Sequence, residues 1–206
     1  MLKIWGRNNS VNVQKVMWTV AELGLEHERI DVGGAFGRLD TPEYGAMNPN
    51  RRIPVVQDGA LVVWESNACV RYLAAKYGSG SLWSEDPGAR ALADMWMDWM
   101  GNTLNPDMTL VFLGLIRTPP EQRDMNAIKA AVGRLGESWK ILDAHLAARS
   151  YVAGEHLTMG DVPVGTACYR YYQLAIDRPS LPNVEAWYGR LQTRAAFVQH
   201  VMIPLS

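Results

Sequence analysis

The sequence predicts an α/β domain with the order βαβαββα, followed by a domain built only of helices. Within residues 1–78 the hydrophobic pattern switches between the two-residue period of strands and the 3.6-residue period of helices. Glycine, serine and proline then gather in residues 79–88, as is typical of a linker. Residues 89–206 contain helical patterns and no convincing strand. We therefore expect two domains, 1–78 and 89–206, joined by that linker.

The first half begins with a β-α-β unit. A strand is predicted at residues 2–5, where side chains alternate up to Gly6. The next segment has apolar residues at helical spacing and ends at Gly24: Val13, Val16, Met17, Val20 and Leu23. A second strand is predicted at residues 27–32, with Ile30 and Val32 on one face, before a Gly-Gly break.

The rest of this half adds a short helix, a hairpin and a third helix. Thr41-Pro42-Glu43 marks a helix start, because proline is tolerated at the first helical position. The apolar runs 54–57 and 61–64 are joined through Asp58-Gly59, which favours a type I′ hairpin of antiparallel strands. Helical residues then continue from Glu65 to Tyr77.

Four helical segments are predicted in the second half. The first is long, residues 89–116, and Asn105-Pro106 indicates a bend within it. The second has apolar residues spaced by fours and threes, which is typical of a bundle helix: Ile128, Val132, Leu135, Trp139, Leu142 and Leu146. Residues 160–174 and 183–193 are the remaining two.

Composition excludes several classes of function. The chain has 206 residues, 48% of them hydrophobic, and its net charge is −1. Because like charges form no block, we expect neither nucleic acid nor a membrane as a partner. The first residues lack the apolar segment of a signal peptide, so the cytoplasm is the expected location. Cys69 and Cys168 are expected to be free thiols, and the four histidines have no metal-ligand spacing, so no metal site is expected.

The first candidate site is the loop between the first strand and the first helix. Ligands of α/β sheets bind at the carboxyl ends of strands, and this loop places Ser10 near a helix N-terminus, where free N–H groups favour an anion. A hydroxyl that donates to a bound thiolate would lower the pKa of that thiol. The alternative, favoured by residue type alone, is that Ser10 or Asn12 only caps the helix.

Two further segments carry polar groups that a ligand could use. Pro54 opens a strand, and a cis Ile53-Pro54 bond would turn the preceding backbone outward, although an ordinary trans proline is the commoner case. Glu65-Ser66 opens the third helix, where a carboxylate beside a hydroxyl and free N–H groups can hold the head of an α-amino acid. The alternative is a helix start with its usual acidic residue.

Taken in order, these segments resemble the glutathione-binding domain of the glutathione S-transferase family, a thioredoxin-like βαβαββα unit. Residues 65–73, Glu-Ser-Asn-Ala-Cys-Val-Arg-Tyr-Leu, resemble the family's Glu-Ser-x-Ala-Ile-x-x-Tyr-Leu helix, and Pro54-Val55 resembles its strand entry. Residues 154–161 are similar to its Gly-x-x-x-Ser/Thr-x-x-Asp segment, in which Thr158 and Asp161 would form a reciprocal capping box. The resemblance covers essentially the whole chain.

The resemblance also narrows the type of site. In one class of the family a tyrosine lies against the glutathione sulfur, and in another a cysteine occupies the first loop. No tyrosine precedes Tyr44 and no cysteine precedes Cys69, so the chain resembles the bacterial theta-like or nu-like members, of serine or asparagine type. This resemblance implies that Ser10 hydrogen-bonds the thiolate and that Asn12 assists or substitutes for it.

Glutathione-binding residues follow from the same resemblance. Arg52 would pair with the glycyl carboxylate. The backbone of Ile53, before Pro54, would bond the cysteinyl unit. Glu65 and Ser66 would hold the γ-glutamyl head.

The family's second-substrate pocket lies between the first loop and the fourth helix. Met100, Thr103 and Tyr169 are therefore candidates for it, together with Arg7. Arg7 either selects anionic electrophiles or is merely solvated, and the solvated interpretation is slightly favoured. The methionine and tryptophan stripe at residues 95–100 is interpreted as core or dimer interface.

The function implied is a cytoplasmic detoxification enzyme, a glutathione transferase that acts on a small hydrophobic electrophile with glutathione as co-substrate. The family is usually homodimeric, and Asp94 would reach the partner's glutathione. Two alternatives stay open, a glutathione-dependent disulfide-bond reductase and a non-catalytic binding module. Ser10 and the Glu65-Ser66 pair argue against the second, because a scaffold needs no clamp for a ligand.

Overall fold

A computed structural model describes residues 1–206. The first half contains a four-stranded sheet and three α-helices, as predicted: β1 (Leu2–Trp5), α1 (Val11–Glu22), β2 (His27–Ile30), α2 (Pro42–Met47), β3 (Val55–Asp58), β4 (Leu61–Trp64) and α3 (Ser66–Tyr77). The strand order is β2-β1-β3-β4. β1 and β2 are parallel, and the other two pairs are antiparallel, so a single crossover helix, α1, joins the parallel pair.

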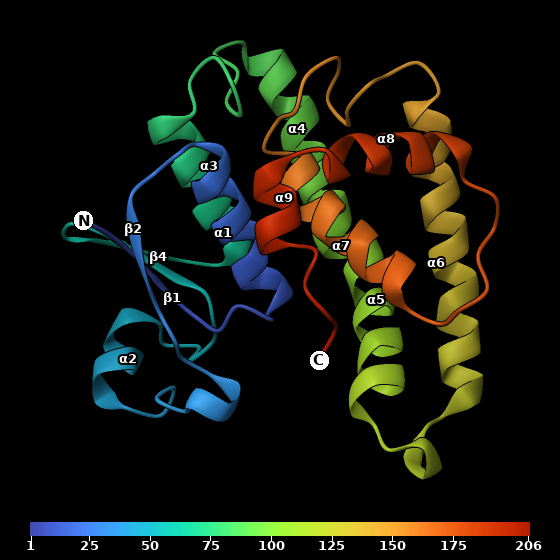
Figure 1. Cartoon of the computed structure of the whole chain (residues 1–206), viewed down its shortest axis with the longest axis horizontal. Helices are drawn as coiled ribbons and strands as arrows, with labels where there is room; N and C mark the ends of the chain where they lie inside the picture. Colours follow the sequence, from blue (N-terminus) through green and yellow to red (C-terminus); the bar gives the residue numbers. More distant parts are fainter.

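The two faces of the sheet bury different sets of side chains. Ile4 and Val56 face α1 and α3, whereas their neighbours Trp5 and Val55 pack with Tyr44 of α2 on the other face. Figure 1 shows α1 and α3 on the side of the sheet that faces the helical half, with α2 on the outer side. Because side chains alternate between the two faces of each strand, one face of the sheet packs against α1 and α3, and these two helices lie next to the second half.

Two details of the strands differ from prediction. The second strand ends at Ile30, before the predicted end, although Val32 still packs on the same face as Ile30. The hairpin has Gly59 and Ala60 as its central residues, and Gly59 has φ +62° while Ala60 has no positive φ. A positive φ at the first central residue alone is the pattern of a type II′ turn, so the type I′ prediction is wrong.

The second half is helical, as predicted. Its α-helices are α4 (Pro87–Trp99), α5 (Asn105–Phe112), α6 (Met125–Leu146), α7 (Asp161–Gln173), α8 (Pro182–Gln192) and α9 (Ala195–His200). Residues 195–200 were not predicted to be helical. No helix combines the length and the apolar character that a membrane span requires.

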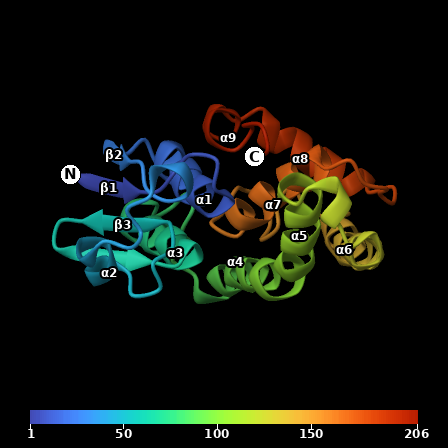
Figure 2. The same cartoon turned by 90° about the horizontal axis from the view of Figure 1, so that it is seen from below.

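The predicted long helix is continuous but not regular. α4 and α5 are joined by a π-helical turn, Met100–Leu104, and α5 continues into a second one, Leu113–Arg117. The first π turn ends two residues before Pro106, which has no N–H for the helix ladder and whose ring would clash with a regular preceding turn. Figure 2 shows α4 and α5 running in different directions on either side of this turn.

α1 is buried on every side because the second half covers the face that the sheet leaves open. It contacts α3, α7 and α9, and Figure 2 shows it between the sheet and α7. Its Trp18 belongs to the core of the helical half and packs edge-on against Phe197, with ring centroids 4.8 Å apart. A Cβ at Gly165 of α7 would lie 2.9 Å from the Trp18 ring, so glycine is required for this approach.

The predicted capping box at Thr158 and Asp161 forms in one direction only. The Asp161 carboxylate accepts from Thr158 N at 2.8 Å, as expected. The Thr158 hydroxyl instead accepts from Gly160 N at 3.3 Å. Asp161 is fully buried and also accepts from Val152 N and Trp187 Nε1, both at 3.0 Å, so it links three parts of the helical half.

Candidate active site

The hydroxyl of Ser10 is not used to cap α1. Ser10 occupies the N-cap position with extended backbone angles, φ −87° and ψ 123°, but its side chain makes no capping hydrogen bond. The expectation that Ser10 or Asn12 only caps the helix is therefore wrong for Ser10. A half-buried hydroxyl is left beside the free N–H groups of the first turn of α1, where the helix dipole favours a negative charge.

The second segment lies directly against this loop. Gly6 has φ +152°, and a Cβ there would lie 2.5 Å from Val13 and 3.4 Å from the Cβ of Ile53, so the loop, α1 and residue 53 meet at this glycine. The Ile53–Pro54 peptide bond is cis, the less common of the two alternatives. The carbonyl of Arg52 accepts from Tyr44 Oη at 2.9 Å and from Asn48 Nδ2 at 2.8 Å. The side chain of Arg52 itself is exposed.

The third segment is bonded to the first. The Ser66 hydroxyl at the start of α3 donates to Asn12 Oδ1 at 3.2 Å. Glu65, just before Ser66, is exposed and has φ +67°, a conformation that non-glycine residues rarely adopt. The structure thus brings Ser10, Asn12 and the Glu65-Ser66 pair to the adjoining N-terminal ends of α1 and α3.

A buried lysine, which was not predicted from the sequence as a site residue, contacts the N-terminal end of α3. Lys15 is 4% exposed, and its ammonium donates to Ser66 Oγ and to Asn67 Oδ1, each at 3.2 Å. Burial, together with the charge of the nearby Arg170, lowers its pKa to about 7, although the charge of Glu65 opposes this shift. The sequence offers one clue, its place on α1 beside Val16. That place is buried because α1 packs against both α3 and the helical half.

The candidates for the second-substrate pocket divide into two groups. Met100 and Tyr169 are 2% and 5% exposed and belong to the core of the helical half. The Tyr169 hydroxyl donates to the carbonyl of Ile203 at 2.8 Å. Thr103 is exposed, and Arg7 is half-buried, with its Nη1 bonded to Asn9 Oδ1 at 2.5 Å. Only the last two side chains thus leave surface open for a ligand.

Asp94 and the aromatic stripe lie where α3 meets α4. Asp94 accepts from Arg71 Nε of its own chain at 2.5 Å and is 37% exposed. Within the stripe, Trp96 and Met97 are buried core residues, as interpreted from the sequence, whereas Met95 is 50% exposed.

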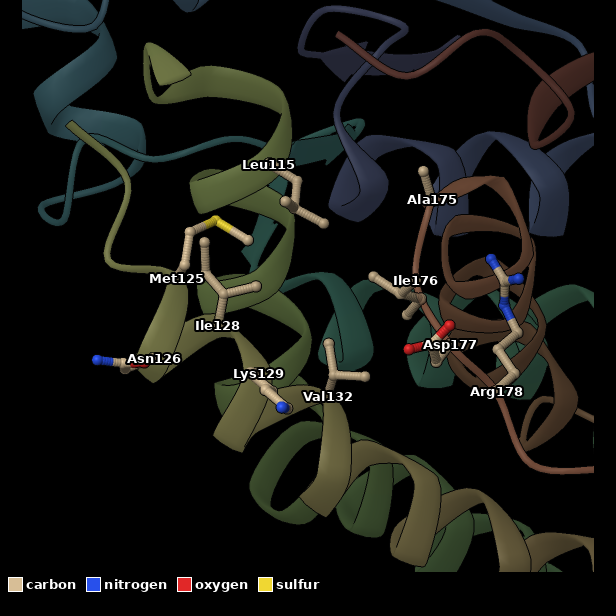
Figure 3. Close-up of a pocket in the computed structure, with 10 residues that line it drawn as sticks. All are labelled: Leu115, Met125, Asn126, Ile128, Lys129, Val132, Ala175, Ile176, Asp177 and Arg178. Atoms are coloured by element: carbon tan, nitrogen blue, oxygen red, sulfur yellow. The ribbon is translucent and has the colours of Figure 1, made fainter. Parts of the chain in front are cut away.

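A cavity of about 660 Å³ lies in the helical half, and none of the predicted site residues lines it. Figure 3 shows that Leu115, Met125 and Ile128 form one wall, while Ile176 lies across from them on the segment after α7. No three His, Cys, Asp or Glu side chains gather in a way that could hold a metal ion.

Both cysteines are free, as predicted, and both are buried. Burial raises the pKa of Cys69 to about 12 and raises that of Cys168 well above its usual range. Neither thiol is therefore available as a thiolate near neutral pH.

A thioredoxin-like sheet with a cis proline, followed by a helical domain, is the architecture of the glutathione-transferase-like class of protein, and comparison with known proteins agrees. Residues 1–75 match the glutathione S-transferase N-terminal domain, and residues 125–190 match the C-terminal domain. Glutathione S-transferase GstB of Escherichia coli K12 is 41% identical over 208 residues, with full coverage of both chains. A probable glutathione S-transferase, GSTF2 of rice, is 27% identical over 94% of this chain and 92% of the relative.

The solved structures agree with the sequence comparison. The theta class glutathione S-transferase of Xanthomonas axonopodis pv. citri with glutathione bound is 47% identical, with a TM-score of 0.96 over 100% of this chain and 99% of that chain. Its apo form gives a TM-score of 0.88, at 41% identity over 100% and 98% of the two chains. This chain belongs to the glutathione S-transferase family.

Proposed function

We propose that this chain is a glutathione transferase in which the Ser10 hydroxyl stabilises the thiolate of bound glutathione for attack on an electrophile. The observation that carries the proposal is the N-cap serine whose hydroxyl caps nothing. The two buried cysteines support it, because the reacting sulfur has to come from a co-substrate.

Each part of glutathione finds a chemically suitable group around Ser10. The γ-glutamyl head would bind at Glu65 and Ser66, and contacts with Asn12 and Lys15 hold the Ser66 hydroxyl in position. The cysteinyl unit would lie along Ile53 before the cis Pro54. The exposed Arg52 side chain is available for the glycyl carboxylate. These assignments place the glutathione sulfur at the N-terminus of α1.

The chemistry follows from that placement. A hydroxyl donor and the dipole of α1 both favour the charged form of the thiol and lower its pKa from about 8.5 toward neutral pH. The thiol proton leaves to solvent, and the thiolate attacks the electrophile without a covalent enzyme intermediate. Asn12, already held by Ser66, would assist Ser10.

The experiment is Ser10→Ala, with Ser180→Ala as the control because Ser180 is an exposed serine far along the chain. Ser10→Ala should leave glutathione affinity within about threefold and raise the pKa of the bound thiol by about one to two units, since one hydrogen bond to a charged group is worth about 1.5–3 kcal/mol. The absorbance of the thiolate as a function of pH measures the pKa of the bound thiol. An unchanged titration in Ser10→Ala would remove Ser10 from this role and make Asn12→Ala the next variant to examine.

Two simple assays separate transfer from the alternatives. Conjugation of a chloroaromatic compound is expected to exceed reduction of a model disulfide, whereas the reverse order would favour a glutathione-dependent reductase. Retention on a glutathione-affinity column is expected, and passage in the flow-through would favour a non-catalytic module.

We further propose that the chain forms a homodimer through α3 and α4 and acts in the cytoplasm, in the detoxification of electrophiles. Leu92 and Met95 of α4 are 47% and 50% exposed, and a partner would cover this apolar surface. Asp94 lies between them, beside its ion pair with Arg71, and would face the partner's glutathione. Two cysteines that form no disulfide fit a reducing compartment. Sedimentation equilibrium tests the dimer, and a monomer at micromolar concentration would refute it.

A further inference from the structure

Three arginines from different segments meet beside the loop that carries Ser10. Arg7 is in that loop, Arg117 ends the second π turn after α5, and Arg170 is on α7. The guanidinium carbons of Arg170 and Arg117 lie 3.7 Å and 5.2 Å from the centre of the Phe112 ring. Two of the three cations therefore share one aromatic ring.

A chain of hydrogen bonds connects Arg7 to the same group. Arg7 Nη1 donates to Asn9 Oδ1, and Asn9 Nδ2 donates to Ser206 Oγ, each at 2.5 Å. Arg117 Nη2 donates to the main-chain oxygen of Ser206 at 2.9 Å. Figure 1 shows the end of the chain, marked C, extending from α9 into the space beside α5. The first loop, the end of the long helix and the last residues thus form one connected region.

No Asp or Glu side chain pairs with this arginine cluster, Arg7, Arg117 and Arg170, and only Arg117 bonds a terminal oxygen of the last residue, Ser206. None of the ion pairs in the chain includes any of the three. Arg170 is only 9% exposed, yet its guanidinium makes no hydrogen bond, and the buried Nε of Arg7 has no partner either. Burial, together with the charges of Arg117 and Arg7, lowers the pKa of Arg170 to about 10. A buried Arg7 Nε without an acceptor and like charges close to one another both cost free energy, which a bound anion would offset.

We propose that the arginine cluster binds a negatively charged group of the second substrate, so that the electrophile conjugated by this chain is an anion. This inference rests on the proposed function and narrows its substrate class. A guanidinium matches a carboxylate with two parallel hydrogen bonds, and Phe112 adds an apolar surface on which the body of the substrate can pack. Ser10 N donates to the carbonyl of Arg7 at 3.4 Å, so the cluster and the thiolate site belong to the same loop.

The reaction is an ordinary substitution with an anionic substrate. With 4-chloro-3,5-dinitrobenzoate, the thiolate sulfur forms a C–S bond at the ring carbon that carries chlorine, and the C–Cl bond then breaks. Chloride leaves with its electron pair, and the carboxylate takes no part in the bond changes. The corresponding carboxamide has the same shape and the same leaving group but no charge, so the two compounds form a matched pair.

Binding without turnover tests the cluster directly. The unreactive compounds 3,5-dinitrobenzoate and 3,5-dinitrobenzamide are titrated by calorimetry into the full chain saturated with glutathione. The benzoate is expected to bind at least about tenfold more tightly than the benzamide. Arg170→Gln and Arg117→Gln should each reduce this preference to about threefold or less. Because Arg117 is exposed, its variant keeps the test valid if Arg170→Gln does not fold.

The control is Arg134→Gln, which removes an exposed arginine of α6 that pairs with Asp107, and it should keep the full preference. Equal affinity for the two compounds, or a preference that survives in both cluster variants, would overturn the inference. Weaker binding of glutathione itself in those variants would also overturn it, because the cluster would then serve the co-substrate.

Turnover of the two chloro compounds, each relative to its uncatalysed rate with glutathione, separates this inference from the proposed function. If the benzoate analogue binds with the expected preference and neither chloro compound is conjugated, the transferase proposal fails and the anion site stands. If the carboxamide is conjugated as well as the carboxylate and binding shows no preference, the transferase proposal stands and the anion site is refuted.

Discussion

Replacement of Lys15 by methionine should stabilise the protein at neutral pH and lose that advantage at alkaline pH. The side chain is buried, and its charge has two hydrogen-bond partners, Ser66 and Asn67, but no carboxylate within ion-pair distance. Methionine has a similar length and no charge, so Lys15→Met removes the cost of burying the ammonium. Ser66 keeps its bond to Asn12, and Asn67 keeps its bond to the Met97 carbonyl.

The magnitude follows from the difference in pKa between the two states. An unfolded lysine keeps its proton up to a pKa of 10.5, whereas native Lys15 releases it near a pKa of about 7. Between these values the unfolded state binds more protons, so the stability of the wild-type chain rises with pH. The cost of holding Lys15 in the fold is about 4 kcal/mol at pH 7 and about 2 kcal/mol at pH 9. Loss of two hydrogen bonds subtracts about 2 kcal/mol from the gain at either pH.

The expected result is a gain for Lys15→Met of about 2 kcal/mol at pH 7 that falls to about zero at pH 9. Urea unfolding followed by tryptophan fluorescence at pH 7, 8 and 9 measures it. Lys129→Met is the control, because Lys129 is exposed on α6 and its replacement should give a difference that does not change over this range. A difference between Lys15→Met and wild type that is independent of pH would refute the reasoning, because burial would then not have lowered the pKa of this lysine.

Two further substitutions test how the second half is held together. Trp18→Ala should cost about 3–5 kcal/mol in the free energy of unfolding, because this side chain of α1 fills the core of the helical half against Phe197. Equilibrium denaturation measures the loss, and a cost below about 1 kcal/mol would mean that the two halves pack independently. Asp161→Ala should cost a similar amount, about 3–5 kcal/mol, because the buried donors of Val152, Thr158 and Trp187 would lose their acceptor. Thermal unfolding followed by circular dichroism measures this loss of stability. A melting temperature within about 2 °C of wild type would contradict the role of Asp161 as the acceptor for these donors.

Most of the fold could be predicted from the sequence, because its signals are local. The alternation at residues 2–5 and the helical spacing after Val13 depend on neighbours within a few positions, and both elements form where they were expected. The errors also have local causes. The hairpin turn has Gly59 as its first central residue instead of its second, and the short helix α9 carries no strong apolar period.

The candidate site could be predicted only in part. Ser10, Ile53 and Ser66 are far apart in the sequence, and their meeting was expected only through the resemblance to a known family. Once that family is known, motif positions are sufficient to name them. Lys15 and Arg170 were missed, because a polar residue on a helix is expected to face solvent unless a second layer covers it.

The order of strands and helices, the change from a mixed half to a helical half, and the membership of the family were determined by the sequence alone. They depend on side-chain spacing, on proline and glycine positions, and on short motifs, which act over a few residues. The tertiary structure determined the surroundings of the charged side chains at the site. Lys15 is buried because α1 packs against α3 and the helical half. The three arginines come together without an Asp or Glu partner because the helical half approaches the first loop. Burial and the approach of distant charges are properties of packing.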